Sequence, residues 1–494
     1  MSFRKILIAN RGEIAVRIAR TCRAMGIATV AVYSDADKGA LHVREADEAL
    51  RIGPPEAASS YLSIDAILDA ARKSRADALH PGYGFLSQNG DFADAVSSAG
   101  IAFIGPPGDV HRRMGDKRGA RRLMAANGIP VLPGYDGSDQ SDATLSAEGA
   151  RIGWPLMLKP SRGGGGKGMR VVRGPGDFAS ALAASRREAV AAFGDDVMVL
   201  ERFVERSRHV EVQILADAGG QVLHLGEREC SIQRRHQKVV EETPSPALDA
   251  AGRMALCASG VAAARAASYV NAGTVEFLLD AEGRFFFLEM NTRLQVEHAV
   301  TEAVTGLDLV RLQIETAAGR LPLADTDVAP RGHAIECRVY AEDPDRGDLP
   351  SAGRVLHLVA PEGPGIRFDS GVAAGSEVGV HYDPLLAKVI AFGRDRDESI
   401  GRMSAALSRT VVLGVGTNLW RLREILAHRA FLAGELHTGF IEEHLPVSSG
   451  PSSPPPAAIA AAVGALQQTK AAPSGLRVSA SDDPWHTLGS WRLA

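Results

Sequence analysis

The first 114 residues alternate short apolar runs with stretches of helical periodicity. We predict strands at 6–9, 29–32, 78–79 and 102–104, and a helix that begins at Glu13. Strands that alternate with helices in this way predict a doubly wound α/β unit. The turn before Glu13 carries one glycine where the dinucleotide-binding fingerprint needs three, so the pattern does not predict that kind of nucleotide site.

A second pattern predicts a β-hairpin that carries two carboxylates. Residues 273–279 and 284–291 are rich in β-branched, aromatic and apolar positions, and the turn-like segment 280–283 lies between them. If the turn centres on its Glu-Gly dipeptide, with a two- or four-residue loop, the strands pair antiparallel and Glu276 lies opposite Glu289. Directly opposed side chains have Cβ atoms roughly 4.5–5.5 Å apart.

The two glutamates of this hairpin form a candidate metal site together with Asn291. Asn291 follows Glu289 by two residues, so both point to the same face of the strand. Carboxylate and carboxamide oxygens suit Mg²⁺ or Mn²⁺, which leave positions open for nucleotide phosphates. The alternative is a pair of exposed glutamates on a solvated sheet face. A register slip of one residue would also turn one carboxylate away.

A glycine-rich segment follows a predicted apolar strand at 154–158. Lys159 precedes five glycines in the six positions 163–168, and a second strand is predicted at 169–172. Glycines let backbone N–H groups approach phosphate oxygens, and lysines add positive charge. The segment is not a Walker A loop, because glycine follows its lysine where Ser or Thr is needed. We predict a hairpin flap over a nucleotide; a flexible surface loop is the alternative.

Two weaker signals accompany these motifs. In the segment RRHQKVVEE, His236 and Lys238 are two residues apart and share a face if the segment is extended, which would suit a small anion. A solvated basic stretch is an equally good interpretation. The segment HPGYGFLSQN, residues 80–89, predicts a Pro/Gly turn whose aromatic residue can close over a ring.

Composition narrows the class of protein. Of 494 residues 45% are hydrophobic, and the net charge of −4 implies no nucleic-acid partner. The N-terminus leads straight into a strand, and no apolar stretch is long enough to span a membrane, so neither a signal peptide nor a membrane partner is expected. We expect a cytoplasmic location, since metal or disulfide spacing is lacking among the four cysteines, which are Cys22, Cys230, Cys257 and Cys337.

Taken together, these motifs resemble one family. HPGYGFLS, the lysine with its glycine-rich loop, RRHQKVVEE, GTVEF, EMNTRLQVEH and IECRVYAEDP stand in the order and spacing of the biotin carboxylases. The resemblance covers about residues 3–445. It implies an α/β fold with an N-terminal doubly wound domain, an ATP-grasp fold with a small flap domain, and a C-terminal mixed α/β domain. The divisions we expect are 1–114, a bridging helical segment 115–130, a flap 131–203, a core and C-terminal part 204–445, and a tail 446–494.

The resemblance also implies a reaction. Biotin carboxylases use MgATP and bicarbonate to form carboxyphosphate, then carboxylate a ureido nitrogen of biotin on a carrier domain. Implied cofactors are therefore ATP, Mg²⁺ or Mn²⁺, and biotin on a separate carrier. Implied partners are that biotin carboxyl carrier domain in trans, a carboxyltransferase subunit and bicarbonate, with assembly as a homodimer or in a larger carboxylase complex.

Site residues follow from the family motifs, position by position. The ATP positions are Lys117, Lys159, Gly164, Gly165, Gly166, Met169, Glu201, Arg202, Val204, His209, Gln233 and His236. The metal positions are Glu276, Glu289 and Asn291. The bicarbonate and catalytic positions are Lys238, Arg293, Gln295, Val296, Glu297 as general base, and Arg338 as the group that stabilises the biotin enolate. The biotin positions are Tyr83, Gly84, Gln295 and Arg338.

Three residues depart from the family pattern. Arg162 stands where a small residue is usual, Arg202 where a lysine is usual, and Gln88 where many relatives have glutamate. None removes a catalytic group. The alternatives are another ATP-grasp ligase, a fragment of a pyruvate or urea carboxylase, and a non-catalytic subunit.

The C-terminal stretch predicts a linker and the start of another domain. Residues 446–456 hold five prolines, an alanine-rich helix is predicted at about 457–470, and the last residues resemble the segment that follows the carboxylase in acyl-CoA carboxylase α chains of the methylcrotonyl- and propionyl-CoA types. The MKM triplet that marks a biotin carrier does not occur in this sequence. We therefore expect the chain to receive its carrier domain in trans.

Overall fold

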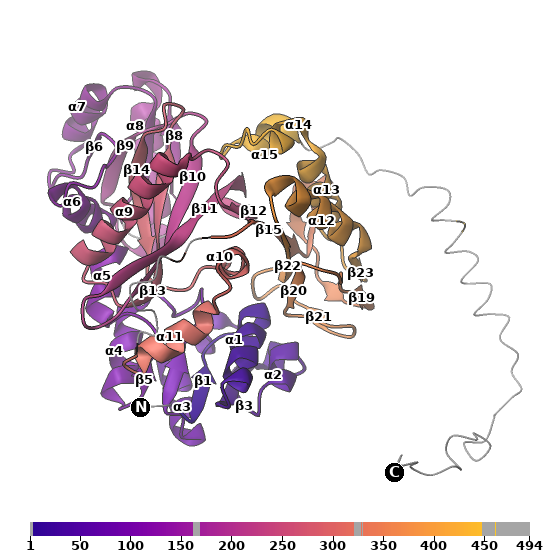
Figure 1. Ribbon diagram of the computed structural model, residues 1–494. Coiled ribbons are helices and arrows are strands. Elements are labelled where there is room, and N and C mark those ends of the chain that lie inside the picture. Colours follow the sequence, from indigo (N-terminus) through magenta and orange to yellow (C-terminus); the bar gives the residue numbers. More distant parts are fainter. Residues whose placement is uncertain (1–2, 162–167, 321–327, 329, 447–459, 461–494) are drawn as a thin grey trace, which may run out of the picture. The chain divides into compact units, whose positions relative to one another are not determined.

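The N-terminal part is a five-stranded parallel sheet in the order β3-β2-β1-β4-β5 (Figure 1). The computed structural model describes residues 3–161, 168–320, 328, 330–446 and 460. The strands are β1 (Lys5–Ile8), β2 (Ala28–Ser34), β3 (Glu48–Gly53), β4 (Ala78–His80) and β5 (Ala102–Phe103). The helices are α1 (Gly12–Ala24), α2 (Leu41–Glu45), α3 (Ile64–Ser74) and α4 (Gly90–Ser98). The doubly wound prediction is confirmed, although it missed β3.

Strand β3 lies at the edge of the sheet, which explains why the sequence pattern did not predict it. Two charged residues, Glu48 and Arg51, interrupt the apolar positions of its sequence EALRIG, and both are exposed. A buried parallel strand has an almost continuous apolar run, as in β1, whereas an edge strand does not need one. Helices α5 (Gly108–Gly115) and α6 (Lys117–Ala126) follow the sheet, and the Asp116 carboxylate caps α6 by accepting from the Arg118 N–H.

A four-stranded antiparallel sheet, in the order β6-β9-β7-β8, forms a separate small layer with two helices. Its elements are β6 (Gly134–Tyr135), α7 (Asp142–Ile152), β7 (Leu156–Pro160), β8 (Arg170–Val172), α8 (Pro175–Phe193) and β9 (Met198–Arg202). Leu158 and Leu200 are paired across β7 and β9 and pack with Phe178 and Leu182 of α8. The strands on both sides of the glycine-rich segment therefore pair as predicted, while residues 162–167 lie outside the described part of the chain.

The largest sheet has eight strands in the order β14-β13-β10-β11-β12-β15-β22-β20. They are β10 (Arg208–Ala216), β11 (Val222–Arg234), β12 (Gln237–Thr243), β13 (Asn271–Leu279), β14 (Phe285–Asn291), β15 (His333–Tyr340), β20 (Ile366–Ser370) and β22 (Leu385–Gly393). Apolar side chains of one face pack on helices α9 (Ala250–Ala266), α12 (Arg396–Arg409), α13 (Leu419–Ala427), α14 (Arg429–Leu432) and α15 (Phe440–His444). Alternation along each strand turns the polar side chains to the opposite face.

A β-bulge sets the predicted carboxylate pair in the β13–β14 hairpin. Leu279 pairs with Phe285, so the connection has five residues, 280–284, and the predicted loop of two or four residues is wrong. That turn alone would place Glu276 opposite Leu288. The register shifts by one residue between Glu276 and Phe277, which leaves Leu288 as the extra residue and brings Glu289 opposite Glu276.

The basic segment after β11 turns where the sequence pattern suggested an extended strand. Arg235 and His236 have φ of 48° and 65°, and they form the two-residue turn between β11 and β12. Two consecutive residues with positive φ are typical of the hairpin turn whose twist matches its strands. His236 therefore does not share a strand face with Lys238, and that part of the prediction is wrong.

The remaining elements connect these layers. They are α10 (His298–Thr305), α11 (Leu309–Ala317), β16 (Glu342–Asp343), β17 (Leu349–Pro350), β18 (Gly353–Arg354), β19 (His357–Val359), β21 (Glu377–Val378) and β23 (Val411–Leu413). Among the residues that the structure describes, no helix combines the length and apolar character needed to cross a bilayer. Residues 1–447 form one compact unit; of the second, 448–494, only residue 460 is described, and the rest of the predicted linker, helix and tail lies outside the described residues.

Candidate active site

One cavity of about 360 Å³ gathers most of the predicted site residues. Its walls come from the small sheet (β7 and β9), the hairpin β11–β12 and the hairpin β13–β14. The predicted residues that line it are Lys117, Lys159, Met169, Glu201, Arg202, Val204, His209, Gln233, His236, Lys238, Glu276, Glu289, Asn291, Arg293, Gln295, Val296 and Arg338. These residues are spread over more than 200 positions of sequence, so the fold assembles the site from distant motifs.

Lys238 stands at the centre of one end of the cavity among three carboxylates. Its Nζ lies 2.6 Å from Glu211 Oε2, 2.8 Å from Glu276 Oε1 and 2.6 Å from Glu297 Oε1. All three glutamates are buried. Glu211 lies close enough to Glu276 and, on its other side, to Glu297 to suggest a metal site, but the ammonium of Lys238 already supplies the cation that holds the three carboxylates together.

These contacts set the ionisation of the site. Burial would raise the pKa of Glu297, but Lys238 and Arg338 outweigh burial and hold that pKa well below its ordinary value. Burial would also raise the pKa of Glu276, but Lys238 and His209 outweigh burial and lower that pKa. Burial and the neighbouring Glu297 raise the pKa of Glu211. Glu276 and Glu297 are therefore anionic at neutral pH.

Glu276 and Glu289 fit a divalent cation in different ways. Glu276 Oε1 accepts from the Asn291 and Gln295 side-chain amides, each at 2.9 Å, and His209 Nε2 lies 3.1 Å from its other oxygen. Within the described part of the chain, no side-chain hydrogen bond or ion pair occupies the Glu289 carboxylate. The pair thus offers one held and one unengaged carboxylate, opposed across the hairpin, which suits Mg²⁺ or Mn²⁺. Asn291 presents its NH₂ to Glu276, so its amide must turn for its oxygen to join them.

Arg338 closes the same end of the cavity from β15. Its Nε donates to Glu241 Oε1 at 2.6 Å, and its Nη2 donates to Glu297 Oε2 at 2.9 Å. The hydrogen bond from Nη1 to the Tyr340 hydroxyl is long, at 3.5 Å, so Nη1 keeps donor capacity for a ligand. Burial together with the weaker influence of Glu297 raises the pKa of Glu241 to about 7, even though Arg338 lowers it.

Arg293 is held by neutral partners. Its Nε donates to Gln88 Oε1 at 3.0 Å and its Nη1 donates to Gln295 Oε1 at 2.7 Å. Gln88 in turn donates to Asn291 Oδ1 at 3.4 Å. Because no carboxylate contacts Arg293 within the described residues, its charge remains available to an anion at the cavity wall.

The other end of the cavity suits the phosphates and ring of a nucleotide. Lys159 contacts the Glu201 carboxylate, and Arg121 Nη1 lies 3.6 Å from the same group. Burial lowers the pKa of Lys117, and the charge of Lys159 lowers it further, so a polyanion between the two lysines relieves their repulsion. The apolar lining that a purine ring would contact is Leu132, Met157, Met169, Val199, Phe203, Val204 and Leu278.

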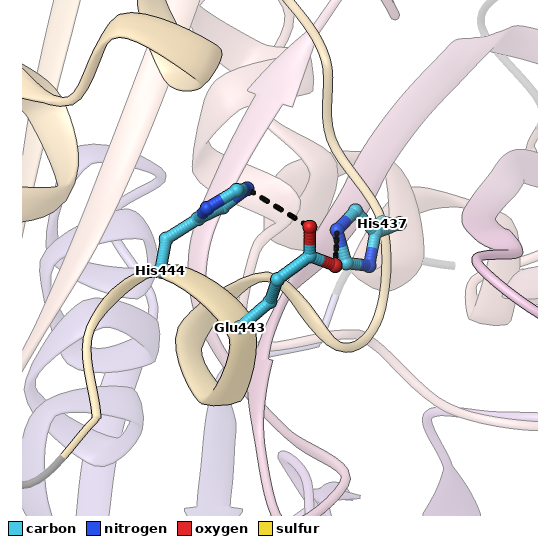
Figure 2. A group of neighbouring side chains, drawn as sticks. All are labelled: His437, Glu443 and His444. Carbon is cyan, nitrogen blue, oxygen red and sulfur yellow. Dashed lines mark ion pairs between the residues drawn. The ribbon is translucent and has the colours of Figure 1, made fainter.

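A histidine group begins next to Thr438, a residue of the cavity lining (Figure 2). His437 Nε2 lies 3.2 Å from Glu443 Oε2, and His444 Nε2 lies 3.9 Å from Glu443 Oε1. The backbone N–H of Gly439 donates to His437 Nδ1, so the proton of a neutral ring is on Nε2, the atom that faces Glu443. Arg206 also contacts Glu443. Because Nε2 of a neutral His437 carries the proton and Arg206 already engages Glu443, the group suits a structural brace better than a metal site.

Some predicted residues do not line the cavity. Glu297 is fully buried beneath it and contacts two residues of its lining, Lys238 and Arg338. Tyr83 and Gly84 lie in the loop after β4, and the Tyr83 hydroxyl donates to Glu13. The flap glycines of the prediction, Gly164, Gly165 and Gly166, lie outside the described residues.

The sequence interpretation missed several groups that shape the site. Glu211 pairs directly with Glu276 across β10 and β13, and Glu241 binds Arg338 from β12. Arg228 is fully buried, and its Nε donates to Glu211 at 2.6 Å. The signal for Glu211 was present: residues 209–214 read HVEVQI, in which polar and apolar positions alternate strictly, as on a strand with one face in the core and one in a site.

Comparison with known proteins gives family matches along most of the chain. Residues 2–110 match the model for the biotin carboxylase N-terminal domain, residues 116–324 the ATP-binding domain of the carbamoyl-phosphate synthase L chain, and residues 336–443 the biotin carboxylase C-terminal domain. A biotin carboxylase of Halalkalibacterium halodurans is 50% identical over 451 residues, which cover 91% of this chain and 99% of that protein. The mitochondrial methylcrotonoyl-CoA carboxylase subunit alpha of Glycine max is 50% identical over 442 residues, or 89% of this chain. The match covers 60% of that subunit's length.

Solved structures with the same fold contain nucleotides, and one of them also contains bicarbonate. The Campylobacter jejuni biotin carboxylase in complex with β,γ-ATP superposes with a TM-score of 0.88 at 40% identity, covering 90% of this chain and 99% of that chain. The biotin carboxylase domain dimer of the Hydrogenobacter thermophilus 2-oxoglutarate carboxylase, in complex with MgADP, ADP and bicarbonate, has the same TM-score at 42% identity. It covers 92% of this chain and 100% of that chain.

Proposed function

Because this chain belongs to the biotin carboxylase family, a family of ATP-dependent ligases, we propose that it carboxylates biotin with MgATP and bicarbonate. The observation that supports this proposal most directly is the make-up of one cavity. Lys117 and Lys159 stand at one end, Lys238 and Arg338 at the other, and the Glu276–Glu289 pair between them. A phosphate donor, its metal and a second anion can therefore meet in one place.

The nucleotide end positions ATP for transfer. Lys117 and Lys159 bind the phosphates, and the apolar wall near Phe203 and Leu278 receives the adenine ring. Glu276 and Glu289 would hold the divalent cation, which neutralises charge on the phosphates as they react. The Glu276 carboxylate is already held by the Gln295 amide, so it needs little reorganisation on binding.

Bicarbonate is proposed to bind between Lys238 and Arg293. Both are cations that line the cavity, and Val296 lines it with them. Glu297 is ionised and contacts Lys238, so it can accept the bicarbonate proton as the oxygen attacks phosphorus and becomes acidic. Attack forms carboxyphosphate and releases ADP.

Arg338 is proposed to serve the second step. The phosphate that carboxyphosphate releases with CO₂ accepts the N–H proton of the ureido ring, which leaves negative charge on the ring oxygen, and a fixed cation beside that oxygen stabilises the transition state. Nη1 is the Arg338 atom with spare donor capacity at the cavity wall. The nitrogen then takes CO₂ from carboxyphosphate, and phosphate leaves.

The test is a pair of coupled measurements on the purified chain. ATP hydrolysis is expected to require bicarbonate and to rise on addition of biotin, while carboxybiotin accumulates slowly. A biotinylated carrier domain is expected to be the better substrate, because tethering raises effective concentration and orients the ring. ATP turnover that does not depend on bicarbonate over a wide concentration range would overturn the proposal, and turnover that requires ammonia or an amino acid would favour another ATP-grasp ligase.

Gln88 provides a second prediction, on bicarbonate affinity. Gln88→Glu places a carboxylate against Arg293 and removes the amide donor to Asn291. The new ion pair competes with bicarbonate, so the KM for bicarbonate is expected to rise about 2–5-fold, the range of a partly exposed ion pair. The KM for ATP is the internal control and is expected to remain unchanged. A bicarbonate KM that stays the same or falls would contradict this role of Arg293.

The proposed reaction also requires partner proteins. A biotin carrier domain supplied in trans and a carboxyltransferase subunit are the partners that this half-reaction needs, and a homodimer or a larger complex is the proposed assembly. The carboxyltransferase determines the acyl acceptor, so a pyruvate or urea carboxylase fragment remains the competing assignment.

We also propose the functional divisions 1–114, 115–130, 131–203 and 204–445. A cytoplasmic location stays a prediction, because relatives include both bacterial enzymes and mitochondrial subunits.

A further inference from the structure

A fully buried lysine that the proposed chemistry does not use lies directly behind the site. Lys388 is in the middle of β22, opposite Arg338 of β15, and none of its surface is exposed. On β15, Ile335, Cys337 and Val339 pack in the apolar core, so Arg338 and its β22 neighbour belong to the polar face of the sheet. A buried ammonium is costly unless it has partners, so its contacts indicate what it holds.

Lys388 has two partners from different parts of the chain. Its Nζ donates to the backbone oxygen of Val296 at 2.6 Å, and it lies 3.2 Å from Glu13 Oε1. Burial would lower the pKa of Lys388, but Glu13 and the further charge of Glu336 outweigh it and raise the pKa, so the lysine is charged. It therefore fixes both the proposed bicarbonate wall and the first turn of α1.

Glu13 links Lys388 to the loop that carries Tyr83. Its Oε1 also accepts from the Tyr83 hydroxyl, and its second oxygen is buried without a hydrogen bond among the described residues. Gly371, just after β20, brings the chain against the same turn: a Cβ there would lie 2.6 Å from the Glu13 backbone nitrogen. Helix α1 thus docks on the polar face of the large sheet through this turn (Figure 1).

We propose that Lys388 is a positioning residue that fixes the Val296 segment and, through Glu13, the Tyr83 loop relative to each other. The inference rests on the proposed function, in which Val296 lies beside bicarbonate and Tyr83 beside the biotin ring. One ammonium then sets the distance between the two binding sites, so that carboxyphosphate forms where the ureido nitrogen can reach its product. Lys388 itself does not line the cavity and touches no substrate.

The test compares Lys388→Met with Arg396→Met as a matched control. Arg396 also pairs with a buried glutamate of this sheet, Glu242, at 2.7 Å, but it lies away from the cavity lining. Lys388→Met is expected to raise the KM for bicarbonate and for biotin about 10–100-fold and to consume more ATP per carboxybiotin formed, because misplaced reactants lose their alignment. The KM for ATP is expected to stay within about twofold, and Arg396→Met is expected to change only the melting temperature.

Glu13→Gln keeps the test decisive if Lys388→Met does not fold. It retains an acceptor for Tyr83 but loses the charge that pairs with Lys388, so it is expected to affect biotin KM and coupling more than bicarbonate KM. Where Lys388→Met folds, the double variant is expected to resemble the more impaired single variant, since the residues act in one chain of contacts. Wild-type bicarbonate dependence reports separately on the proposed function. Normal coupling in both single variants, or effects equal to those of Arg396→Met, would overturn the positioning role.

Discussion

Replacing Arg338 with methionine is expected to lower the rate of biotin carboxylation about 10²–10³-fold, the loss for one oxyanion-type contact. Bicarbonate-dependent ATP cleavage is expected to fall much less. The reason is the order of the steps: the guanidinium faces the charge that develops on biotin, whereas carboxyphosphate forms earlier. Lys238 continues to hold Glu297 in the ionised state after Arg338 is lost.

The pH profile gives this prediction a second measurement. Arg338 lowers the pKa of both Glu297 and Glu241, so its removal raises both values. Glu297 must be ionised to accept a proton, and the acid limb of ATP cleavage is therefore expected to move to higher pH in Arg338→Met. A merely misfolded variant would lose amplitude without this displacement.

Both half-reactions are measured on each variant, with Arg396→Met as the control for removing an arginine of α12 that pairs with a buried glutamate of the same sheet. Phosphate release with and without biotin reports ATP cleavage, and transfer of labelled bicarbonate to biotin reports carboxylation. Equal losses in the two half-reactions would remove Arg338 from the second step.

Local patterns were sufficient for the elements that contain the site. Alternating and apolar runs predict both strands of the β13–β14 hairpin, and the opposition of Glu276 and Glu289 is confirmed. The predicted opposition is correct because two features compensate each other. The turn is one residue longer than the predicted four-residue loop, and the bulge at Leu288 shifts the register back by one residue. A bulge is set by packing of the whole sheet, as with Phe287 in the core, and a local pattern does not contain that information.

Contacts between distant strands were beyond a local pattern. Glu241 approaches Arg338 because β12 pairs with β15, and Lys388 lies behind Arg338 because β15 pairs with β22. Neither pairing leaves a mark at a fixed spacing in the sequence. A buried lysine in a run such as LLAKVIAF looks like an isolated charge until the topology supplies Glu13 and Val296 as its partners.

Glu289→Gln is expected to reduce kcat/KM for MgATP about 10²–10³-fold while leaving the fold intact. The opposed Glu276 is occupied by Lys238, Asn291 and Gln295, whereas the Glu289 carboxylate has no side-chain partner among the described residues and is the group most available to a cation. Removing its charge therefore weakens metal binding without breaking a hydrogen bond.

A measurement of stability distinguishes metal binding by Glu289 from a purely structural role of this residue. The free energy of unfolding is expected to change by less than about 0.5 kcal/mol in Glu289→Gln, as for a substitution that removes no buried contact. The matched control is Glu282→Gln in the exposed turn of the same hairpin, which should leave both activity and stability unchanged. Raising Mg²⁺ or Mn²⁺ should recover part of the Glu289→Gln activity by mass action. If excess metal recovers nothing and the loss tracks a fall in melting temperature, Glu289 supports the hairpin and the cation must be held elsewhere.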